Sequence, residues 1–90
     1  MRLTQHARVR AQQRGLPPLI IDWLLGYGTS SADGHGGMVY YFDRRGRRQL
    51  ERDCGRKVVS QLSGYLDGYA VVVDDQVVTV GHRYRPIRSN

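Results

Sequence analysis

The sequence is poor in cysteine and has no long apolar run. Cys54 is the only cysteine in 90 residues, so no disulfide can form within the chain. The longest strictly apolar runs, Leu19–Ile21 and Ala70–Val73, are far shorter than the ~20 residues that a membrane helix needs. The N-terminus also lacks a cationic segment followed by an apolar signal core. We therefore expect a cytoplasmic protein that does not span a membrane.

Metal ligands and cofactor motifs are equally scarce. The chain has three histidines, one cysteine and a single glutamate, Glu51, and these have no spacing typical of a metal site. It also contains no P-loop, no GxGxxG motif after a strand and no GxSxG motif. The sequence therefore predicts no metal and no cofactor, and it gives no support to acyl-transfer chemistry.

Lysine is almost absent, whereas arginine is abundant. Lys57 is the only lysine among 14 Lys and Arg residues, and with 8 Asp and Glu the formal net charge is +6. The hydrophobic fraction of 40% is close to that of globular proteins, so residues 1–90 should fold as a single domain. A basic surface concentrates polyanions around it, and RNA is the partner that we expect.

Three helices are expected from capping residues and apolar spacing. Thr4 can cap a helix over residues 5–14, and Gly15 is typical of the residue that follows a helix. A pair of prolines can begin a second helix within residues 17–28, where apolar residues recur at helical spacing. Apolar residues at similar spacing predict a short third helix within residues 58–66.

Strands are expected in the second half of the chain. Gly28–Gly37 has the composition of a surface loop. Met38–Asp43 and Arg47–Arg52 read as a hairpin with a charged edge strand, and the valine-rich segments Tyr69–Val73 and Gln76–His82 read as a central hairpin. The expected fold class is therefore α+β, with two N-terminal helices and a short third helix packed on a roughly four-stranded antiparallel sheet.

His6, Arg10 and Arg14 are four residues apart and form one stripe along the first expected helix. Small apolar residues beside the stripe should pack on the sheet, which places the stripe at the rim of the packed face. His6 lies in the first turn, where the helix dipole favours a neutral ring that can act as a general base. In the alternative interpretation, His6 bonds a nearby carbonyl group and both arginines are structural. Arg8 falls on the opposite side and should be solvated.

A second cluster, His82, Arg83, Tyr84 and Arg85, ends the last expected strand. Alternation places the histidine and the tyrosine on one face and the two arginines on the other. If the first helix crosses this strand end, the two clusters share one cleft; otherwise these side chains only cover an edge. Arginines beside a neutral histidine suit cleavage of RNA, because a base takes the 2′-hydroxyl proton and guanidinium groups stabilise charge on phosphorus.

The expected hairpin of residues 38–52 carries the densest basic cluster: Arg44, Arg45, Arg47, Arg48 and Arg52. Its first strand is aromatic, with Tyr40, Tyr41 and Phe42. In one interpretation, these side chains bind phosphates and stack on bases. In the other, the charges protect an exposed edge strand from unwanted pairing.

Both ends of the chain resemble a family of small bacterial domains. The motif HAxxRxxxRG runs from His6 to Gly15, Leu16-Pro17 and a short helix ending at Gly26 follow it, and VVTVGHRYR closes the similarity. This family is akin to the RelE and BrnT toxins of toxin–antitoxin systems. The resemblance implies an α+β fold, metal-free ribonuclease activity on RNA, which can be ribosome-associated, and an antitoxin partner.

The resemblance also implies a catalytic role for five residues: His6, Arg10, Arg14, His82 and Arg83. The arginines of the expected hairpin, together with Tyr84 and Arg85, would contact the nucleic acid. We therefore expect a toxin-like, metal-independent ribonuclease. The alternative is a non-catalytic basic domain that binds nucleic acid or another protein, since a fold does not determine a function.

Overall fold

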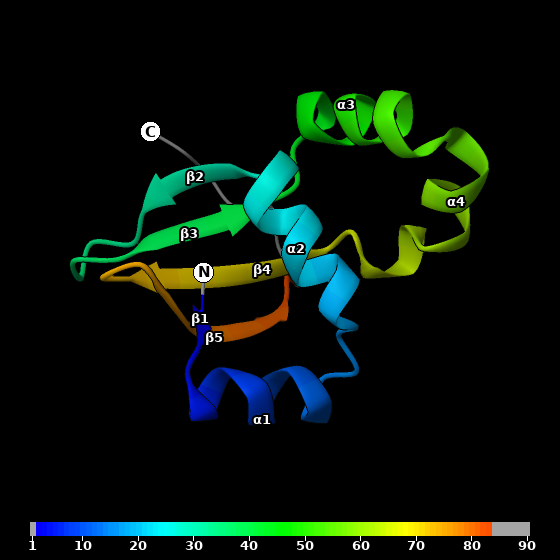
Figure 1. Cartoon of the computed structure of the whole chain (residues 1–90). Coiled ribbons are helices and arrows are strands. Elements are labelled where there is room, and N and C mark those ends of the chain that lie inside the picture. Colours follow the sequence, from blue (N-terminus) through cyan, green and yellow to red (C-terminus); the bar gives the residue numbers. More distant parts are fainter. Residues whose placement is uncertain (1, 84–90) are drawn as a thin grey trace.

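Helices pack on a five-stranded sheet in the computed structural model, which describes residues 2–83 (Figure 1). In chain order the elements are β1 (Arg2–Leu3), α1 (Gln5–Gln13), α2 (Pro18–Tyr27), β2 (Thr29–Ala32), β3 (Met38–Tyr41), α3 (Arg44–Cys54), α4 (Arg56–Gln61), the 3-10 turn η1 (Ser63–Tyr65), β4 (Gly68–Val73) and β5 (Gln76–His82). The helix α2 lies across β3 and β4, and α1 packs along β5. The α+β class is therefore confirmed.

The sheet is mixed, although most of its strands are antiparallel. Its strand order is β1-β5-β4-β3-β2, and only the short β1 runs parallel to its neighbour β5. The backbone N–H of Thr4 continues this pairing with a 2.9 Å bond to the carbonyl of Val77. The sheet thus has five strands instead of about four, because the unexpected strands β1 and β2 are present and the expected strand of residues 47–52 is not.

The N-terminal helices form as their capping residues predict. The Thr4 hydroxyl accepts a hydrogen bond from the Ala7 N–H at 3.2 Å, and Gly15 follows α1 with a φ of 64°, a conformation that favours glycine. Pro18 begins α2, where its missing N–H costs no helical hydrogen bond. Ala7 and Ala11 are the buried residues of α1, and their small side chains let this helix lie close to β5.

A single apolar core joins the helices to the sheet. The largest fully buried side chains are Phe42, Ile20, Leu24, Leu50, Val77 and Val80. They come from α2, α3, β5 and the residue after β3, so every layer of the fold contributes to the core. The expected strands Tyr69–Val73 and Gln76–His82 are confirmed as β4 and β5, joined by a two-residue turn in which both aspartates have positive φ.

The expected strand Arg47–Arg52 is wrong, because these residues belong to the helix α3. Asp43 caps this helix by accepting a 2.7 Å hydrogen bond from the N–H of Gly46. Arg, Gln, Leu and Glu, which fill its middle, all have high helix propensity. Only Gly46 and Leu50 are buried along it, so the sequence of this helix has almost no apolar periodicity that would predict it. The basic residues therefore lie on a helix and do not protect an edge strand.

The expected loop Gly28–Gly37 is also partly wrong. Its first half forms the strand β2, which pairs antiparallel with β3 from Thr29 opposite Tyr41 to Ala32 opposite Met38. A carboxylate oxygen of Asp33 accepts the N–H groups of His35 and Gly37 at 2.7 and 2.9 Å, and these bonds close the turn. The small polar residues of β2 did not predict a strand, because a half-buried edge strand needs no large apolar side chain.

The expected third helix is shorter and ends earlier. The helix α4 ends at Gln61, and η1 then leads into β4. Together α3 and α4 lie beyond the end of the sheet where β3 finishes and β4 begins (Figure 1). A Cβ atom on Gly46 would clash with the carbonyl oxygen of Tyr27, so this glycine lets the first turn of α3 abut the end of α2. Among the helices described, none is long and apolar enough to cross a membrane.

Candidate nucleic-acid interface

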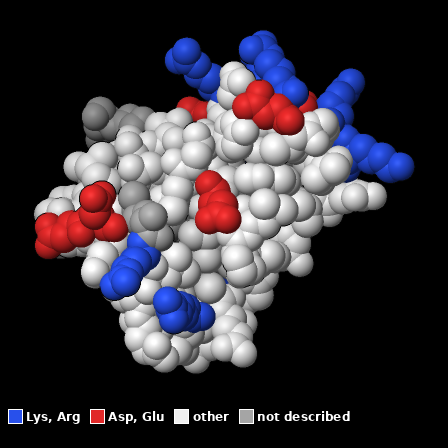
Figure 2. Space-filling view, in the orientation of Figure 1, with Lys and Arg blue, Asp and Glu red and all other residues white. Residues whose placement is uncertain are grey.

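Seven cationic side chains lie on the two helices α3 and α4, and we call them the α3–α4 surface: Arg44, Arg45, Arg47, Arg48, Arg52, Arg56 and Lys57. In residues 2–83, the only charged pair within 4.0 Å joins His82 to Asp67, so none of the seven is paired with a carboxylate. Figure 2 shows cationic side chains projecting from the α3 and α4 end of the molecule, where they outnumber the acidic ones. This surface is therefore available to an external anion.

Two carboxylates near the α3–α4 surface, those of Asp43 and Asp53, accept hydrogen bonds from uncharged donors. Asp43 accepts the Thr29 hydroxyl at 2.6 Å besides capping α3. The Thr29 bond and then the Gly46 N–H hold the pKa of Asp43 below its usual value. Asp53 accepts the Tyr27 hydroxyl at 2.9 Å and the Gln49 amide at 3.2 Å. These bonds fix α3 to its neighbours and leave the arginines without carboxylate partners.

A groove of about 590 Å³ lies between α3 and α4. It is lined by Arg47 and Glu51 of α3, by Arg56, Lys57, Val59 and Ser60 of α4, and by Ser63 and Leu66 beyond it. An amino group of the Arg47 guanidinium donates to the Leu66 carbonyl at 3.1 Å, which holds this side chain in place. The groove therefore combines one anchored cation with two further cations on its rim.

The aromatic residues before α3 do not contribute a surface for base stacking. Phe42 is only 2% exposed and belongs to the apolar core, and Tyr41 is 6% exposed. Tyr40 is half-buried and packs against the same core. The expectation that these aromatic rings stack on bases beside the arginines is therefore wrong, because the rings of Tyr41 and Phe42 are buried in the core.

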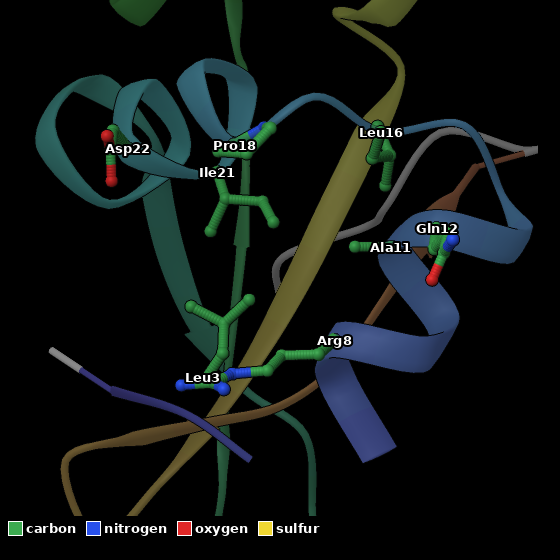
Figure 3. Close-up of a pocket in the computed structure, with 8 residues that line it drawn as sticks. All are labelled: Leu3, Arg8, Ala11, Gln12, Leu16, Pro18, Ile21 and Asp22. Carbon is green, nitrogen blue, oxygen red and sulfur yellow. The ribbon is translucent and has the colours of Figure 1, made fainter. Parts of the chain in front are cut away.

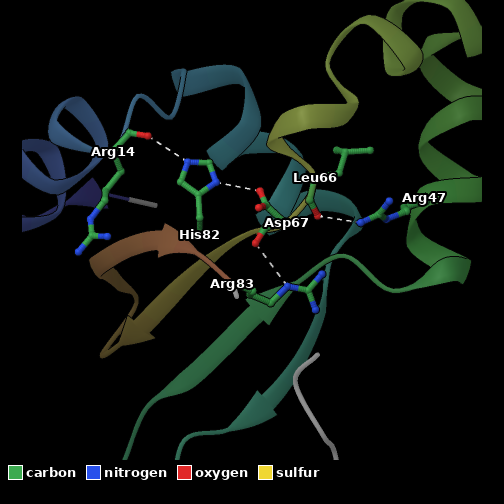
Figure 4. Close-up of polar contacts among 6 residues, drawn as sticks. All are labelled: Arg14, Arg47, Leu66, Asp67, His82 and Arg83. Carbon is green, nitrogen blue, oxygen red and sulfur yellow. Dashed lines mark hydrogen bonds and ion pairs between the residues drawn. The ribbon is translucent and has the colours of Figure 1, made fainter. Parts of the chain in front are cut away.

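His82 sits in a junction between α1, β4 and β5 (Figure 4). Its Nδ1 lies 2.8 Å from Oδ1 of Asp67, and its Nε2 lies 3.0 Å from the carbonyl oxygen of Arg14. A carbonyl only accepts, so Nε2 carries a proton, and the carboxylate favours a second proton on Nδ1. The Asp67 bond, and to a smaller extent the Arg14 carbonyl, raise the pKa of His82 against the opposing effect of burial. His82 is thus suited to hold a proton and not to remove one.

Arg83 is bound to the same junction through backbone groups. Its Nε donates to the Asp67 carbonyl at 3.4 Å, its Nη2 donates to the Phe42 carbonyl at 3.1 Å, and its guanidinium lies 5.2 Å from the centre of the Tyr41 ring. Burial, and next the charge of Arg47, lower the pKa of Arg83. The structure therefore places Arg83 within electrostatic reach of the α3–α4 surface.

His6 lies at the far end of α1 from this junction. The pairing of Thr4 with Val77 fixes the start of α1 beside the start of β5, whereas Arg14 meets His82 at the end of β5. Eight residues of helix separate His6 from Arg14, a rise of about 12 Å. The side chains of His6 and Arg14 are exposed, and within residues 2–83 no hydrogen bond engages the His6 ring. The structure thus brings the backbone carbonyl of Arg14 to His82, beside Arg83, while the Arg14 guanidinium points away from His82 (Figure 4) and His6 lies apart.

Arg8 is exposed, as expected for a solvated charge. It lines a pocket of about 380 Å³ between α1 and α2, whose other walls are Leu3, Ala11, Gln12, Leu16, Pro18, Ile21 and Asp22. Figure 3 shows the Arg8 side chain reaching from α1 toward Leu3. The pocket is largely apolar, and nothing in it connects with the α3–α4 surface.

Three residues of these sites escaped the sequence analysis. Arg56 and Lys57 continue the basic cluster directly after the glycine that ends α3, and their proximity in sequence was a usable signal. Asp67 precedes Gly68, the residue opposite His82 in the β4–β5 register, and the expected hairpin would have placed it there. Tyr84 and Arg85, which we expected to contact nucleic acid, lie outside the described residues.

In the described part of the chain, no group of three or more His, Cys, Asp or Glu side chains is placed to hold a metal ion. No protein-family model, curated protein or solved structure matches the chain. The resemblance to toxin-like domains therefore stays a prediction, and the functional argument rests on the geometry of the α3–α4 surface and the His82 junction.

Proposed function

We propose that this protein binds nucleic acid through the α3–α4 surface, which contacts the phosphates of the backbone. One observation carries the proposal: within residues 2–83, seven cations on two consecutive helices have no carboxylate partner within 4.0 Å. Arginine, which supplies six of them, presents a planar fork that matches phosphate oxygens. Binding should therefore come from phosphate contacts and the counterions that these contacts release.

The buried aromatic rings refine what kind of binding to expect. Single-stranded nucleic acid is usually held by bases stacked on exposed aromatic side chains, but Tyr41 and Phe42 are buried. A surface that reads only phosphates does not distinguish sequences. We therefore expect sequence-independent binding that is at least as tight for a duplex as for a single strand, because a duplex carries two rows of phosphates.

Fluorescence anisotropy with labelled RNA 20-mers, single-stranded and double-stranded, tests this proposal. Between 50 and 200 mM salt, the affinity should fall steeply, with a slope of log K against log salt of about −4 for four to five phosphate contacts. Two duplexes of unrelated sequence should bind within about twofold of each other. An affinity that does not change with salt contradicts the proposal.

A matched pair of variants separates the surface from net charge alone. Arg48→Gln with Arg52→Gln removes two exposed cations from α3, and it should weaken binding about tenfold and reduce the salt slope by about two. Arg2→Gln with Arg8→Gln makes the same change in charge on β1 and α1 and should have an effect of less than about twofold. Equal losses in both double variants would show that binding is not localised to α3 and α4.

The metal-free ribonuclease is a second proposal, and the His82 junction favours it. Asp67 holds His82 as a proton carrier, and Arg83 lies near Arg47 with no carboxylate of residues 2–83 within 4.0 Å. The 2′-oxygen would give its proton to solvent and attack phosphorus, and the P–O5′ bond would break. The two arginines would stabilise the charge on phosphorus, and His82 would protonate the leaving 5′-oxygen once its bond to the Arg14 carbonyl opens. Cleavage of RNA in EDTA, lost in His82→Ala, would support this role.

Two further results decide between the expected roles. Cleavage that is also lost in His6→Ala would require His6 to reach the junction, whereas unchanged cleavage in this variant would exclude it from the mechanism.

The antitoxin partner implied by the toxin resemblance would be an acidic protein that competes with RNA for the α3–α4 surface. Competition between RNA and a co-purified acidic protein in the anisotropy assay would reveal such a partner.

A further inference from the structure

We propose that the groove between α3 and α4 binds a terminal phosphate of the nucleic acid. This inference rests on the proposed function, because it assigns the end of the bound strand to one part of the α3–α4 surface. The groove gathers hydrogen-bond donors from separate elements: Arg47 from α3, Arg56, Lys57 and Ser60 from α4, and Ser63 from η1. Such a convergence of donors suits a group with several acceptor oxygens.

Arg47 is the best-placed of these donors. One of its amino groups donates to the Leu66 carbonyl at 3.1 Å, and this bond fixes the direction of the guanidinium at the groove wall (Figure 4). A guanidinium has five N–H donors, so several stay free for a ligand. Arg83 stands close enough to affect Arg47 electrostatically, and two neighbouring guanidinium groups repel each other. An anion bound beside Arg47 would relieve this repulsion.

The size and floor of the groove favour a chain end over a chain that passes through. Its volume of about 590 Å³ falls within the range of small-ligand pockets. The groove is therefore large enough for one nucleotide. Val59 and Leu66 line it and are nearly buried, so they form a closed apolar floor beneath the donors. A nucleotide that enters this recess can place its phosphate against Arg47 while the rest of the strand follows the exposed arginines of α3.

The charge of the groove favours a phosphomonoester over a phosphodiester. A terminal phosphate carries nearly two negative charges at pH 7 and three acceptor oxygens, whereas a backbone phosphodiester carries one charge. Three cations surround the groove, and its single carboxylate is Glu51. The additional charge and oxygen of a chain end should therefore contribute about tenfold in affinity, the scale of one extra charge-assisted hydrogen bond.

The test uses one RNA 10-mer in three forms: with a 5′-phosphate, with a 3′-phosphate, and with hydroxyl groups at both ends. We expect at least one phosphorylated form to bind the whole protein about tenfold more tightly than the hydroxyl form. The form that gains affinity identifies which end enters the groove. Equal binding of all three forms would overturn the terminal-phosphate site while leaving the proposed function intact. No binding of any form would overturn both.

Two double variants with the same change in charge localise the effect. Arg56→Gln with Lys57→Gln changes the groove and should abolish the preference for the phosphorylated end. Arg44→Gln with Arg45→Gln changes exposed residues of α3 that do not line the groove, and it should weaken all three RNAs while preserving their ratio. A preference that survives the first double variant, or disappears in the second, would overturn the assignment.

A substitution at Glu51 should change the preference for the phosphorylated end in the opposite direction. Its carboxylate lies on the groove wall and opposes a nearby phosphate, so Glu51→Gln should increase the preference for the phosphorylated end about threefold. Thermal unfolding should show that each of these variants is folded. A reduced preference in folded Glu51→Gln would overturn the placement of the phosphate in this groove.

Discussion

The two basic regions of this protein use their charges differently. At the His82 junction, each charged group is bound to the chain: His82 to a carboxylate and a carbonyl, and Arg83 to two carbonyls and an aromatic face. On the α3–α4 surface, no cation has a carboxylate within 4.0 Å in the part of the chain that the structure describes. The junction therefore holds the fold together, whereas the surface is left for a ligand.

This difference shows that a charge count cannot distinguish a structural cation from a binding one. Arg47 illustrates the point, because it belongs to both regions: it donates to the Leu66 carbonyl and also lines the groove. Its anchored end is structural and its free donors face the groove. The three changes below test the separation between the regions, beginning with the attachment of the surface to the fold.

The largest expected effect comes from Leu50→Ala. Leu50 is 0% exposed and is the only large apolar residue of α3 in the core, so its truncation leaves a cavity where this helix joins the domain. We expect the free energy of unfolding to fall by about 3 kcal/mol, measured by urea denaturation. Nucleic-acid affinity should fall with it, because α3 would no longer be held in one orientation.

The matched control for Leu50→Ala is Val58→Ala on α4. Val58 is 43% exposed, and its truncation should change the free energy of unfolding by less than about 0.5 kcal/mol. If Leu50→Ala destabilised the protein no more than this control, α3 would not be anchored by the core, and the α3–α4 surface would not be a fixed structure.

A smaller effect should come from the protonation of His82. Asp67, followed by the Arg14 carbonyl, raises the pKa of His82 above the ordinary histidine value of 6.5, so the folded protein binds this proton more tightly than the unfolded chain. The resulting stabilisation is complete below about pH 6.5 and is lost as the pH rises through the folded-state pKa. Because Asp67 is half exposed, we expect a decrease of about 1 kcal/mol.

Denaturation with urea at several values between pH 5 and pH 9 measures this decrease. His82→Gln should remove the pH-dependent part, and the difference from the unmodified protein should be largest at the acidic end. The affinity for nucleic acid should change little in this variant if the junction is structural. A pH dependence that is unchanged in His82→Gln would assign the titration to another group.

The smallest effect concerns the link between α2 and α3. The Tyr27 hydroxyl donates to Asp53, and this bond with the nearby carboxylate raises the pKa of Tyr27 to about 12. Asp53→Asn should return the pKa of Tyr27 toward the ordinary tyrosine value of 10.0, which an NMR titration with labelled tyrosine can follow. Since both side chains are at the surface, stability should hardly change. A pKa of Tyr27 that stayed near 12 would show that Asp53 is not its partner.

Much of the fold was predictable because local signals agreed with it. A capping threonine marks the start of α1 and a glycine follows its end. The valine-rich sequences of β4 and β5 indicate central strands. The helix α3 was missed because its periodic signal rests on Leu50 alone. Its high helix propensity and the cap at Asp43 were present in the sequence, and they outweigh the expected strand once they are considered together.

The site was less predictable because its contacts are distant in sequence. His82 and Asp67 are 15 residues apart, and the hairpin register could have paired them. His82 and Arg14 are 68 residues apart, and only the packing of α1 along β5 brings them together. No local pattern encodes that arrangement, so the sequence could neither join Arg14 to His82 nor separate His6 from them.

The parallel pairing of β1 with β5 has a consequence for how the chain is made. Thr4 bonds to Val77 and Val78, so segments 74 residues apart in the sequence lie side by side. Contacts between such distant segments form slowly, because a long loop must close before they contribute. On the ribosome, α1 must therefore wait for β5 before its apolar side is covered. During that interval the nascent protein exposes apolar side chains that the complete fold buries, and such exposure favours aggregation.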